Sequence, residues 1–278
     1  MELLHLDPLQ IAKRFSQAGQ SYDEHAIIQK KIAIRLMQLM TEYNCFDREP
    51  VDHKRIFEIG CGSGNLTKLY TDHYSFQQIY LNDLYPEVKQ HFENIGLEKN
   101  ELEQNGFKTQ QLLTWCIGDA EKISFPKELN LIVSSSAIQW MQDLNGLLNK
   151  VNQALVKQGL FCFSTFGTHN LKEVKALTQQ GLSYLDMNEI QQKLEDQGFE
   201  ILHISEHVDT LSFKHPKHVL QHLKATGVTA TASKFRWTKQ SLEDFYQGYR
   251  QFITTDEHEN LVYPLSYHPI YVIARSVV

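Results

Sequence analysis

The sequence predicts an α/β fold with a mostly parallel central sheet flanked by helices, a helical lid at the N-terminus and a helical insertion, or cap, in the C-terminal part. Two observations carry this prediction. Short apolar runs alternate with helical patterns up to residue 166, and such alternation is typical of a parallel sheet covered by helices on both faces. A glycine-rich turn, Gly60–Gly64, follows the first apolar run and precedes a helical pattern.

We expect the 278 residues to form a single domain, since a chain of this length can bury one large core or one core plus a small annex. Residues 1–45 are expected to form the lid, and residues 50–170 the cofactor-binding core. Residues 171–278 are expected to complete the sheet, with a basic helical cap at about 210–260.

The lid is expected to be helical from Ala12 to Met40, because apolar residues recur at helical spacing and no proline interrupts them. Ser21 and Glu24 have the spacing of a capping box, so a new helix is expected to begin near Tyr22.

The core elements follow from apolar runs of strand length and from amphipathic segments between them. The predicted core strands are Arg55–Ile59, Gln78–Asp83, Leu112–Ile117, Leu129–Ser134 and Leu160–Phe166. The predicted helices are Leu66–Asp72, a segment from Pro86 toward Phe92, and Gly146–Val156, which Gly159 closes. Pro86 suits a first helical turn, where its missing N–H costs no hydrogen bond. The polar segment Gly96–Thr109 is expected to be an extended loop or a frayed helix.

The pattern changes beyond residue 170, where helices and strands no longer alternate strictly. Amphipathic spacing predicts further helices at Asn188–Gln197, Pro216–Ala225 and Ser241–Phe252, with Gly198 and Gly227 after the first two. Strands are expected at Ile201–Val208 and Tyr267–Ala274.

The composition is ordinary for a soluble protein and favours a cytoplasmic location without membrane contact. No apolar run approaches the length of a membrane span, and Met1–Asp7 lacks the pattern of a secretory signal. The net charge of −6 argues against bulk binding to nucleic acid. The four cysteines are scattered without a C-x-x-C pair, so we expect no zinc site and no disulfide framework.

The glycine turn is the most informative segment. Three glycines at alternate positions allow a backbone to approach a ligand closely, because no Cβ stands in the way. Together with Glu58 the spacing is E-x-G-x-G-x-G, which differs from the dinucleotide fingerprint and from the phosphate-binding loop. It resembles the first motif of the class I S-adenosylmethionine-dependent methyltransferases. A tight strand–helix turn without a ligand is the alternative interpretation.

Polar residues follow three further strands at their carboxyl ends, where ligands of parallel sheets bind. Asp83 lies about 20 residues after the glycine turn, a position from which a carboxylate can accept both hydroxyls of a ribose. Asp119 and Ala120 are placed to receive an adenine edge. After the fourth strand, Ser134 lines the cleft, and Gln139 and Trp140 offer an amide and a flat wall. Each acid can instead be a turn or cap residue, and Trp140 a core residue.

Five further segments sharpen the resemblance to one family. The motifs are Tyr22-Asp23-x-x-Ala26-x-x-Gln29, Ser134-x-x-Ala137-Ile138-Gln139-Trp140, Phe163-Ser164-Thr165-Phe166-Gly167-x-x-Asn170-Leu171, His222-Leu223-Lys224-x-Thr226-Gly227-Val228 and Tyr267-His268-Pro269-Ile270-Tyr271. Together they resemble the malonyl-acyl-carrier-protein O-methyltransferases of biotin synthesis, nearly over the whole chain. Ser135 departs from the family, which usually has asparagine there.

The resemblance implies a Rossmann-like class I methyltransferase fold, S-adenosyl-L-methionine as cofactor with S-adenosyl-L-homocysteine as product, and no metal. The residues expected to bind the cofactor are Tyr22, Gln29, Glu58, Gly60, Cys61, Gly62, Asp83, Leu84, Asp119, Ala120 and Ser134. Tyr22 is also a candidate contact of the acceptor carboxylate. The implied substrate is the malonyl thioester of an acyl carrier protein, whose free carboxylate is methylated.

Substrate and partner contacts are expected elsewhere along the chain. Candidates on the substrate side are Gln139, Trp140, Arg14, His268 and Tyr271, although His268 suits a packed strand residue better. From Thr210 to Leu242 the sequence has no Asp or Glu, which favours docking of an acidic carrier protein on this stretch or, equally, a merely solvated basic surface. The docking candidates are Lys214, Lys217, Lys224, Lys234, Arg236 and Lys239. We expect a monomer.

Two alternatives stay open. The first is a small-molecule carboxyl or C-methyltransferase of the same fold, which the lid and sheet motifs would fit equally well. The second is a non-catalytic cofactor-binding protein that serves as an assembly partner. The basic stretch favours the carrier-protein interpretation over the first alternative, and the retained acids Glu58, Asp83 and Asp119 favour an enzyme over the second.

Overall fold

The computed structural model describes residues 26–46, 54–93, 101–104, 107–110, 112–227 and 237–277. Its contacts divide the chain into two compact units. The core unit comprises Gln29–Thr165, Asp186–Ser205 and Ile270–Val278. The cap unit comprises Phe166–Leu185 and Glu206–Pro269, together with residues up to Ile28. The predicted division into lid, core and sheet completion within a single domain stays a prediction.

A seven-stranded sheet in the order β5-β2-β1-β6-β7-β12-β8 is the centre of the core unit. Its strands are β1 (Arg55–Ile59), β2 (Gln78–Asp83), β5 (Leu112–Ile117), β6 (Leu129–Ser135), β7 (Leu155–Phe166), β8 (Phe199–Glu206) and β12 (Pro269–Ser276). The pairs β2–β5, β1–β2, β1–β6 and β6–β7 are parallel. The carboxyl ends of these five strands therefore lie along one edge of the sheet, which confirms the predicted α/β architecture.

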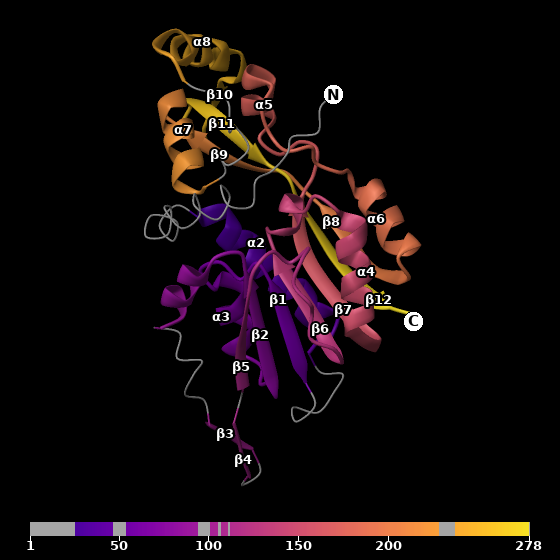
Figure 1. Ribbon diagram of the computed structural model, residues 1–278. Coiled ribbons are helices and arrows are strands. Elements are labelled where there is room, and N and C mark those ends of the chain that lie inside the picture. Colours follow the sequence, from indigo (N-terminus) through magenta and orange to yellow (C-terminus); the bar gives the residue numbers. More distant parts are fainter. Residues whose placement is uncertain are drawn as a thin grey trace. The chain divides into compact units, whose positions relative to one another are not determined.

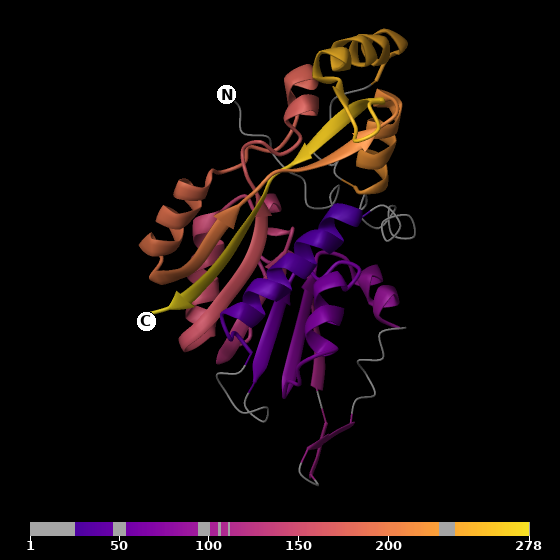
Figure 2. The same ribbon diagram turned by 180° about the vertical axis from the view of Figure 1, so that it is seen from behind.

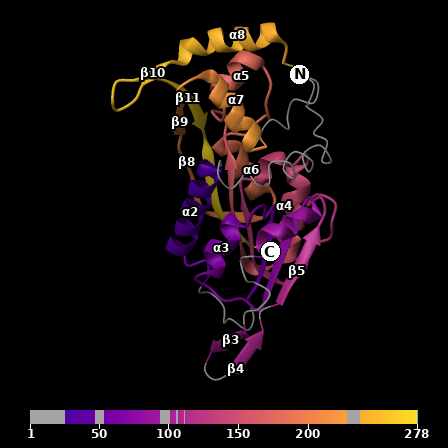
Figure 3. The same cartoon turned by 90° about the vertical axis from the view of Figure 1, so that its left-hand side faces the viewer.

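Helices cover both faces of this sheet. The core-unit helices are α2 (Ile27–Glu42), α3 (Asn65–Thr71), α4 (Leu144–Ala154), α6 (Met187–Asp196) and the 3₁₀ segments η2 (Pro86–Phe92) and η4 (Ile138–Trp140). Figure 1 shows α4 and α6 in front of the sheet, and Figure 2 shows α2 and α3 on the opposite face. Figure 3 gives the view turned by 90°, with α2 and α3 on one side and α4 and α6 on the other.

Apolar spacing explains this packing. On α2, Ile32, Leu36 and Leu39 recur at three to four residues and are fully buried, which is the stripe expected of a helix that packs on a core. On α4, Leu147, Leu148 and Val151 are buried in the same way. The side chain of Asp143 caps α4 by accepting a hydrogen bond from the Gly146 amide.

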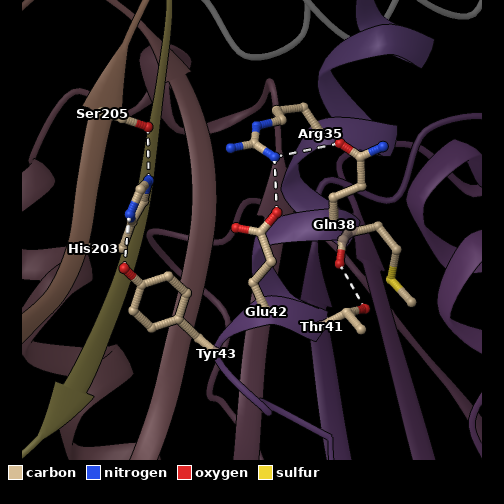
Figure 4. A network of polar contacts seen from close by, with 8 residues as sticks. Arg35, Gln38, Thr41, Glu42, Tyr43, His203 and Ser205 are labelled. Carbon is tan, nitrogen blue, oxygen red and sulfur yellow. Dashed lines mark hydrogen bonds and ion pairs between the residues drawn. The ribbon is translucent and has the colours of Figure 1, made fainter.

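A chain of polar contacts joins the end of α2 to the edge strand β8 (Figure 4). Tyr43 lies just beyond α2, and its hydroxyl oxygen is 3.2 Å from His203 Nδ1. The other ring nitrogen, His203 Nε2, is 2.7 Å from the Ser205 hydroxyl oxygen. Arg35 forms an ion pair at 3.1 Å with Glu42, which lies about two turns further along the same helix. Burial, with the nearby Arg35 charge, lowers the pKa of His203. A neutral His203 suits this position because it can both donate and accept.

The cap unit contains a three-stranded antiparallel sheet in the order β10-β11-β9 (Figure 1). Its strands are β9 (Asp209–Phe213), β10 (Thr254–Thr255) and β11 (Leu261–Tyr267), and its helices are α5 (Lys172–Thr178), α7 (Pro216–Ala225), α8 (Lys239–Tyr249) and the 3₁₀ segment η6 (Arg250–Phe252). Buried polar pairs hold it together. His222 Nε2 lies 2.8 Å from the Tyr267 hydroxyl, and Ser266 donates to Glu173 from both its amide and its hydroxyl.

The structure corrects several predicted elements. The segment Gly96–Thr109, expected to be a loop or frayed helix, contains the hairpin strands β3 (Glu101–Gln104) and β4 (Phe107–Gln110). The predicted helical segment from Pro86 to Phe92 is confirmed, in the form of a 3₁₀ helix. Each of these two strands contains a single apolar residue, Leu102 or Phe107, so the sequence has no alternating pattern that would distinguish a strand from a loop.

Several predictions in the second half were also wrong. Gly159 does not close the helix before it, because α4 ends at Ala154 and β7 already begins at Leu155. The predicted final strand Tyr267–Ala274 crosses a break at His268, because Tyr267 ends β11 and β12 runs over Pro269–Ser276. The strand predicted at Ile201–Val208 lies two residues earlier, as β8 (Phe199–Glu206), and both the strand β9 and the helix α5 were missed. The lid residues before Ala26, including Ser21, Glu24 and Tyr22, lie outside the described residues.

Candidate functional site

The glycine turn connects β1 to α3 in a conformation that requires glycine. Gly60, Gly62 and Gly64 have φ angles of +68°, +53° and +78°, values that residues with a Cβ adopt only with strain. A Cβ added at Gly60 would lie 2.5 Å from the Ala137 Cβ, so the turn packs directly on the segment that follows β6. A Cβ added at Gly62 would meet nothing within 4 Å. The space beside Gly62 is therefore open to a ligand.

Asp83, at the end of β2, is bonded to this turn. Its Oδ2 accepts a hydrogen bond from the Gly62 amide at 2.8 Å, and its Oδ1 accepts one from the Leu84 amide at 2.7 Å. Burial raises the pKa of Asp83 to about 6, although the backbone donors oppose the shift. The Tyr85 backbone amide is a third donor to this carboxylate. A carboxylate has about four acceptor sites, so it can still accept a hydrogen bond from a ligand.

Glu58 lies beneath the turn and holds α3 in place. It is 1 % exposed, and its Oε2 accepts hydrogen bonds from Thr67 at 2.6 Å and from Tyr70 at 2.8 Å. Burial raises the pKa of Glu58 to about 7, while the two hydroxyl donors lower it. The structure thus gives Glu58 an anchoring role, and a direct cofactor contact stays a prediction. Cys61 is buried and free, and burial raises the pKa of its thiol well above the ordinary value.

The loop after β5 carries Asp119 and Ala120 at the same edge of the sheet. Asn82, next to Asp83, donates through Nδ2 to the carbonyls of Cys116 at 2.7 Å and Gly118 at 2.9 Å. The Gly118 amide donates to the Asp83 carbonyl at 2.8 Å. The structure therefore brings Asp83 and Asp119 together, as the sequence predicted from their strand-end positions.

The segment after β6 presents hydrogen-bonding atoms without partners. Ser134 donates to the Ile59 carbonyl at 2.9 Å, so its hydroxyl holds β6 to β1. Ser136 has a left-handed φ of 57°, and its amide donates to Ser164. Gln139 donates through Nε2 to the Ser136 carbonyl. The Ser136 Oγ and Gln139 Oε1 atoms are buried without a hydrogen-bond partner, and so is Gln29 Oε1 on α2.

These orphan atoms test whether the site suits a ligand. A buried polar atom without a partner costs free energy, about 1–3 kcal/mol each, so such atoms usually have a partner in the protein, in ordered water or in a ligand. Two of the three lie in the segment that packs on Gly60. With the open space beside Gly62, they fit a polar organic ligand at this edge of the sheet. Among the described residues, no cluster of His, Cys, Asp or Glu has an arrangement that would hold a metal ion.

The remaining predicted site residues lie in varied surroundings. Trp140 is half-buried beside Gln139, and Leu84 follows Asp83. Tyr271 is 2 % exposed within β12. His268 is also buried, with Nε2 3.1 Å from Glu206 and Nδ1 accepting from the His169 amide. Burial lowers the pKa of His268 against the effect of Glu206, and these contacts agree with a packed residue. Tyr22 and Arg14 lie outside the described residues.

The basic residues of the cap unit are exposed where they are described. Lys214 precedes α7, Lys217 and Lys224 lie on it, and Lys239 begins α8. Lys234 and Arg236 lie outside the described residues.

No helix in the described part of the chain has the length and apolar character that a membrane crossing needs.

Sequence reasoning missed several residues that position the site. Thr67 and Tyr70 hold Glu58, and Asn82 holds the loop after β5. Lys150 on α4 donates through Nζ to the carbonyls of Ala120 at 2.8 Å and Ile123 at 2.6 Å. Asn82 could have been identified from its position directly before the strand-end acid Asp83. Lys150 could not, because it lies 30 residues from Ala120 and no spacing rule links the two.

Comparison with known proteins agrees with this geometry. The family model of a methyltransferase domain matches residues 28–204. A malonyl-[acyl-carrier protein] O-methyltransferase from Acinetobacter baylyi is 48% identical over 274 residues, which are 98% of each chain. An enzyme of the same name from Bacteroides helcogenes is 34% identical and covers 98% of this chain and 99% of its own.

Solved structures support the fold. A methyltransferase structure from Bacillus halodurans has a TM-score of 0.60 at 14% identity, covering 88% of this chain and 99% of that one. The YcgJ protein from Bacillus subtilis has a TM-score of 0.57 at 14% identity, covering 87% and 98%. The Rossmann-like topology and the glycine turn are those of a methyltransferase, and the relatives align with nearly the whole chain. The chain therefore belongs to the malonyl-[acyl-carrier protein] O-methyltransferase family.

Proposed function

We propose that this protein transfers a methyl group from S-adenosylmethionine to the free carboxylate of a malonyl thioester carried by an acyl carrier protein. The observation that carries the proposal is the 48% identity to a relative of that name over 98% of both chains. The strand-end site supports it independently, because it joins a glycine turn, a ribose-competent carboxylate and orphan polar atoms.

The residues at the edge of the sheet would divide the cofactor between them. Gly60, Cys61 and Gly62 would approach its methionine part, because the turn offers backbone groups and open space. Asp83 would accept the ribose hydroxyls, with Leu84 packed on the adenine. Asp119 and Ala120 would receive the adenine edge. When bound, S-adenosylmethionine supplies an electrophilic methyl group.

The acceptor explains why a catalytic base is not required. A carboxylic acid has a pKa near 4, so the malonyl carboxylate is already ionised at neutral pH. It is a weak and strongly hydrated nucleophile, and the protein must exclude water and align one oxygen with the methyl group. Positioning of this kind can supply roughly 7–11 kcal/mol in favourable cases. Gln139 and Trp140 are candidates for this acceptor side.

Tyr22 and Gln29 belong to the lid motif of the sequence. Gln29 has a buried amide oxygen without a partner, which suits a contact with a bound ligand. Tyr22 is proposed to contact the acceptor carboxylate through its hydroxyl. Full methyl transfer by Tyr22→Phe would show that this hydroxyl has no catalytic role.

The carrier protein is proposed to dock on the basic residues of the cap unit. Lys217 and Lys224 lie seven residues apart on α7, so both project from one side of that helix, and both are exposed. Lys214 precedes the same helix. A basic surface would steer an acidic carrier protein toward the enzyme and fix its orientation. The resemblance further implies that the methyl ester formed serves biotin synthesis.

The experiment is an incubation of the purified protein with isotope-labelled S-adenosylmethionine and malonyl-carrier protein, followed by intact-mass analysis. The proposal predicts labelled carrier heavier by one methylene group, and no change with acetyl-carrier protein, which lacks the free carboxylate. Methylation of small malonyl compounds but not of the carrier would favour a small-molecule methyltransferase. Cofactor binding without any methyl transfer would favour a non-catalytic assembly partner.

A further inference from the structure

Two segments of the core unit lie at the edge where β5 and β6 end. The first, Asp119–Ile123, follows β5 and is the proposed adenine side of the site. The second runs from η4, which contains Gln139 and Trp140, through Asp143 into α4 and is the proposed acceptor side. Each would bind a different ligand.

Glu121 is hydrogen-bonded to both segments. Its Oε1 accepts hydrogen bonds from the backbone amides of Gln142 at 3.0 Å and Asp143 at 2.6 Å. Its own amide donates to Asp119 Oδ1 at 3.0 Å. A carboxylate that accepts two amide hydrogens at the start of a helix is favourably placed, because the helix N-terminus carries partial positive charge.

Lys150, in the second turn of α4, is hydrogen-bonded to the same loop. Its Nζ donates to the Ala120 and Ile123 carbonyls, and it lies 4.8 Å from the centre of the Phe125 ring. Burial lowers the pKa of Lys150, while the charges of Asp119 and Glu121 oppose this shift. The loop after β5 is thus joined to the start of α4 by Glu121 and to its middle by Lys150.

We infer that Glu121 is a positioning residue that couples binding of the cofactor to binding of the acceptor thioester. The inference rests on the proposed function, which assigns one ligand to each segment. A ligand that orders Asp119–Ile123 also orders Gln142 and Asp143 through the Glu121 carboxylate. The second ligand then binds to a segment that the first ligand has already ordered. Its binding costs less conformational entropy, so it binds more tightly.

The test measures the dissociation constant of malonyl-carrier protein by calorimetry, with and without saturating S-adenosylhomocysteine. Coupling free energies between sites typically correspond to factors of 5 to 150. We expect about 5-fold tighter binding with S-adenosylhomocysteine in the wild type, at the low end because the Glu121 bonds are reached by solvent. Glu121→Ala should reduce this factor to near 1, while S-adenosylhomocysteine still binds the variant.

Two further variants separate coupling from a general structural effect. Glu121→Gln retains an oxygen that can accept from both amides, and it should preserve part of the coupling. Glu195→Ala removes a carboxylate from α6 that bonds Gln191 on the same helix, and it should leave the coupling unchanged. If Glu121→Ala does not fold, Glu121→Gln alone must still show a factor below that of the wild type.

Equal coupling in the wild type and Glu121→Ala would overturn the inference, and so would a wild-type factor of 1. A wild type that does not bind malonyl-carrier protein in either condition would instead refute the proposed function, and the inference would fall with it. The two failures are distinguishable because the first leaves both ligands binding.

Discussion

Asp83 Oδ2 accepts a hydrogen bond from the Gly62 amide at 2.8 Å, which joins the end of β2 to a turn 21 residues earlier in the chain. The other oxygen of the same carboxylate accepts from Leu84. Asp83 therefore fixes the shape of the glycine turn and presents its remaining lone pairs at the proposed ribose position. The Asp83 side chain therefore has a structural role and a proposed ligand-binding role.

Replacing Asp83 with alanine should weaken both functions. Hydrogen bonds to charged groups contribute about 1.5–3 kcal/mol, so the affinity for S-adenosylhomocysteine is expected to fall roughly 10- to 100-fold. The unpaired Gly62 and Leu84 amides should also lower the melting temperature. Calorimetry and thermal unfolding measure the two effects separately. Wild-type affinity in a destabilised Asp83→Ala protein would refute the ribose role and leave the structural one.

The two buried acids give stability a distinctive pH dependence. Burial raises the pKa of Glu58 from 4.5 to about 7. The folded protein therefore binds more protons than the unfolded chain between these values, and the Glu58 contribution to stability decreases as pH rises through that window. Asp83 acts in the same direction below about pH 6.

Glu58→Gln tests this assignment, since glutamine keeps an oxygen that can accept from Thr67 and Tyr70 but does not ionise. The variant's melting temperature should fall less than that of the wild type between about pH 5 and pH 8. Parallel curves for the two proteins would show that Glu58 does not titrate in this range.

Gly60 and Gly62 form a matched pair for separating stability from binding. Both have positive φ, so alanine at either position costs about 1 kcal/mol of backbone strain. Gly60→Ala adds a clash with Ala137, whereas the Cβ of Gly62→Ala would enter open space. Gly60→Ala should therefore lower the melting temperature more. Gly62→Ala should mainly reduce S-adenosylhomocysteine affinity, by at least roughly 10-fold if the Cβ displaces the ligand. Unchanged affinity in Gly62→Ala would show that the ligand does not occupy that space.

Charge reversal on α7 tests carrier docking. Lys217→Glu combined with Lys224→Glu should raise the KM for malonyl-carrier protein about 10-fold, because close like charges oppose association. The kcat/KM for a small malonyl thioester should stay within about 2-fold. The matched control is Lys127→Glu with Lys157→Glu, two exposed lysines of the core unit that give the same change in net charge. Equal losses on both substrates would exclude a docking role.

The central sheet was largely predictable because each of its strands contains a short apolar run that a turn or loop segment follows. The structure confirms β1, β2 and β5 with the predicted bounds, and the topology places the predicted strand-end acids along one edge. Helix α7 also has its predicted bounds, which Pro216 and the Gly227 region mark in the sequence. These elements depend on local patterns that an isolated sequence carries.

Other features depend on contacts between distant residues. The hairpin β3–β4 lacks the apolar alternation that signals a half-buried strand. The division of the last strand at His268 is accompanied by contacts with Asn170 and Glu206, far away in the chain. The roles of Glu121 and Lys150 likewise arise from bonds to segments about 20 to 30 residues away. No spacing rule identifies such partners before the fold is known.

Hydrogen exchange of the purified protein, with and without S-adenosylhomocysteine, tests most directly whether the strand-end edge is the cofactor site. The account predicts slower amide exchange in Gly60–Gly64, in Asp83–Leu84, in Gly118–Glu121 and in Ser134–Trp140, with smaller changes at the opposite ends of the same strands. Exchange that is unaltered in these four segments, or protection concentrated elsewhere, would contradict it.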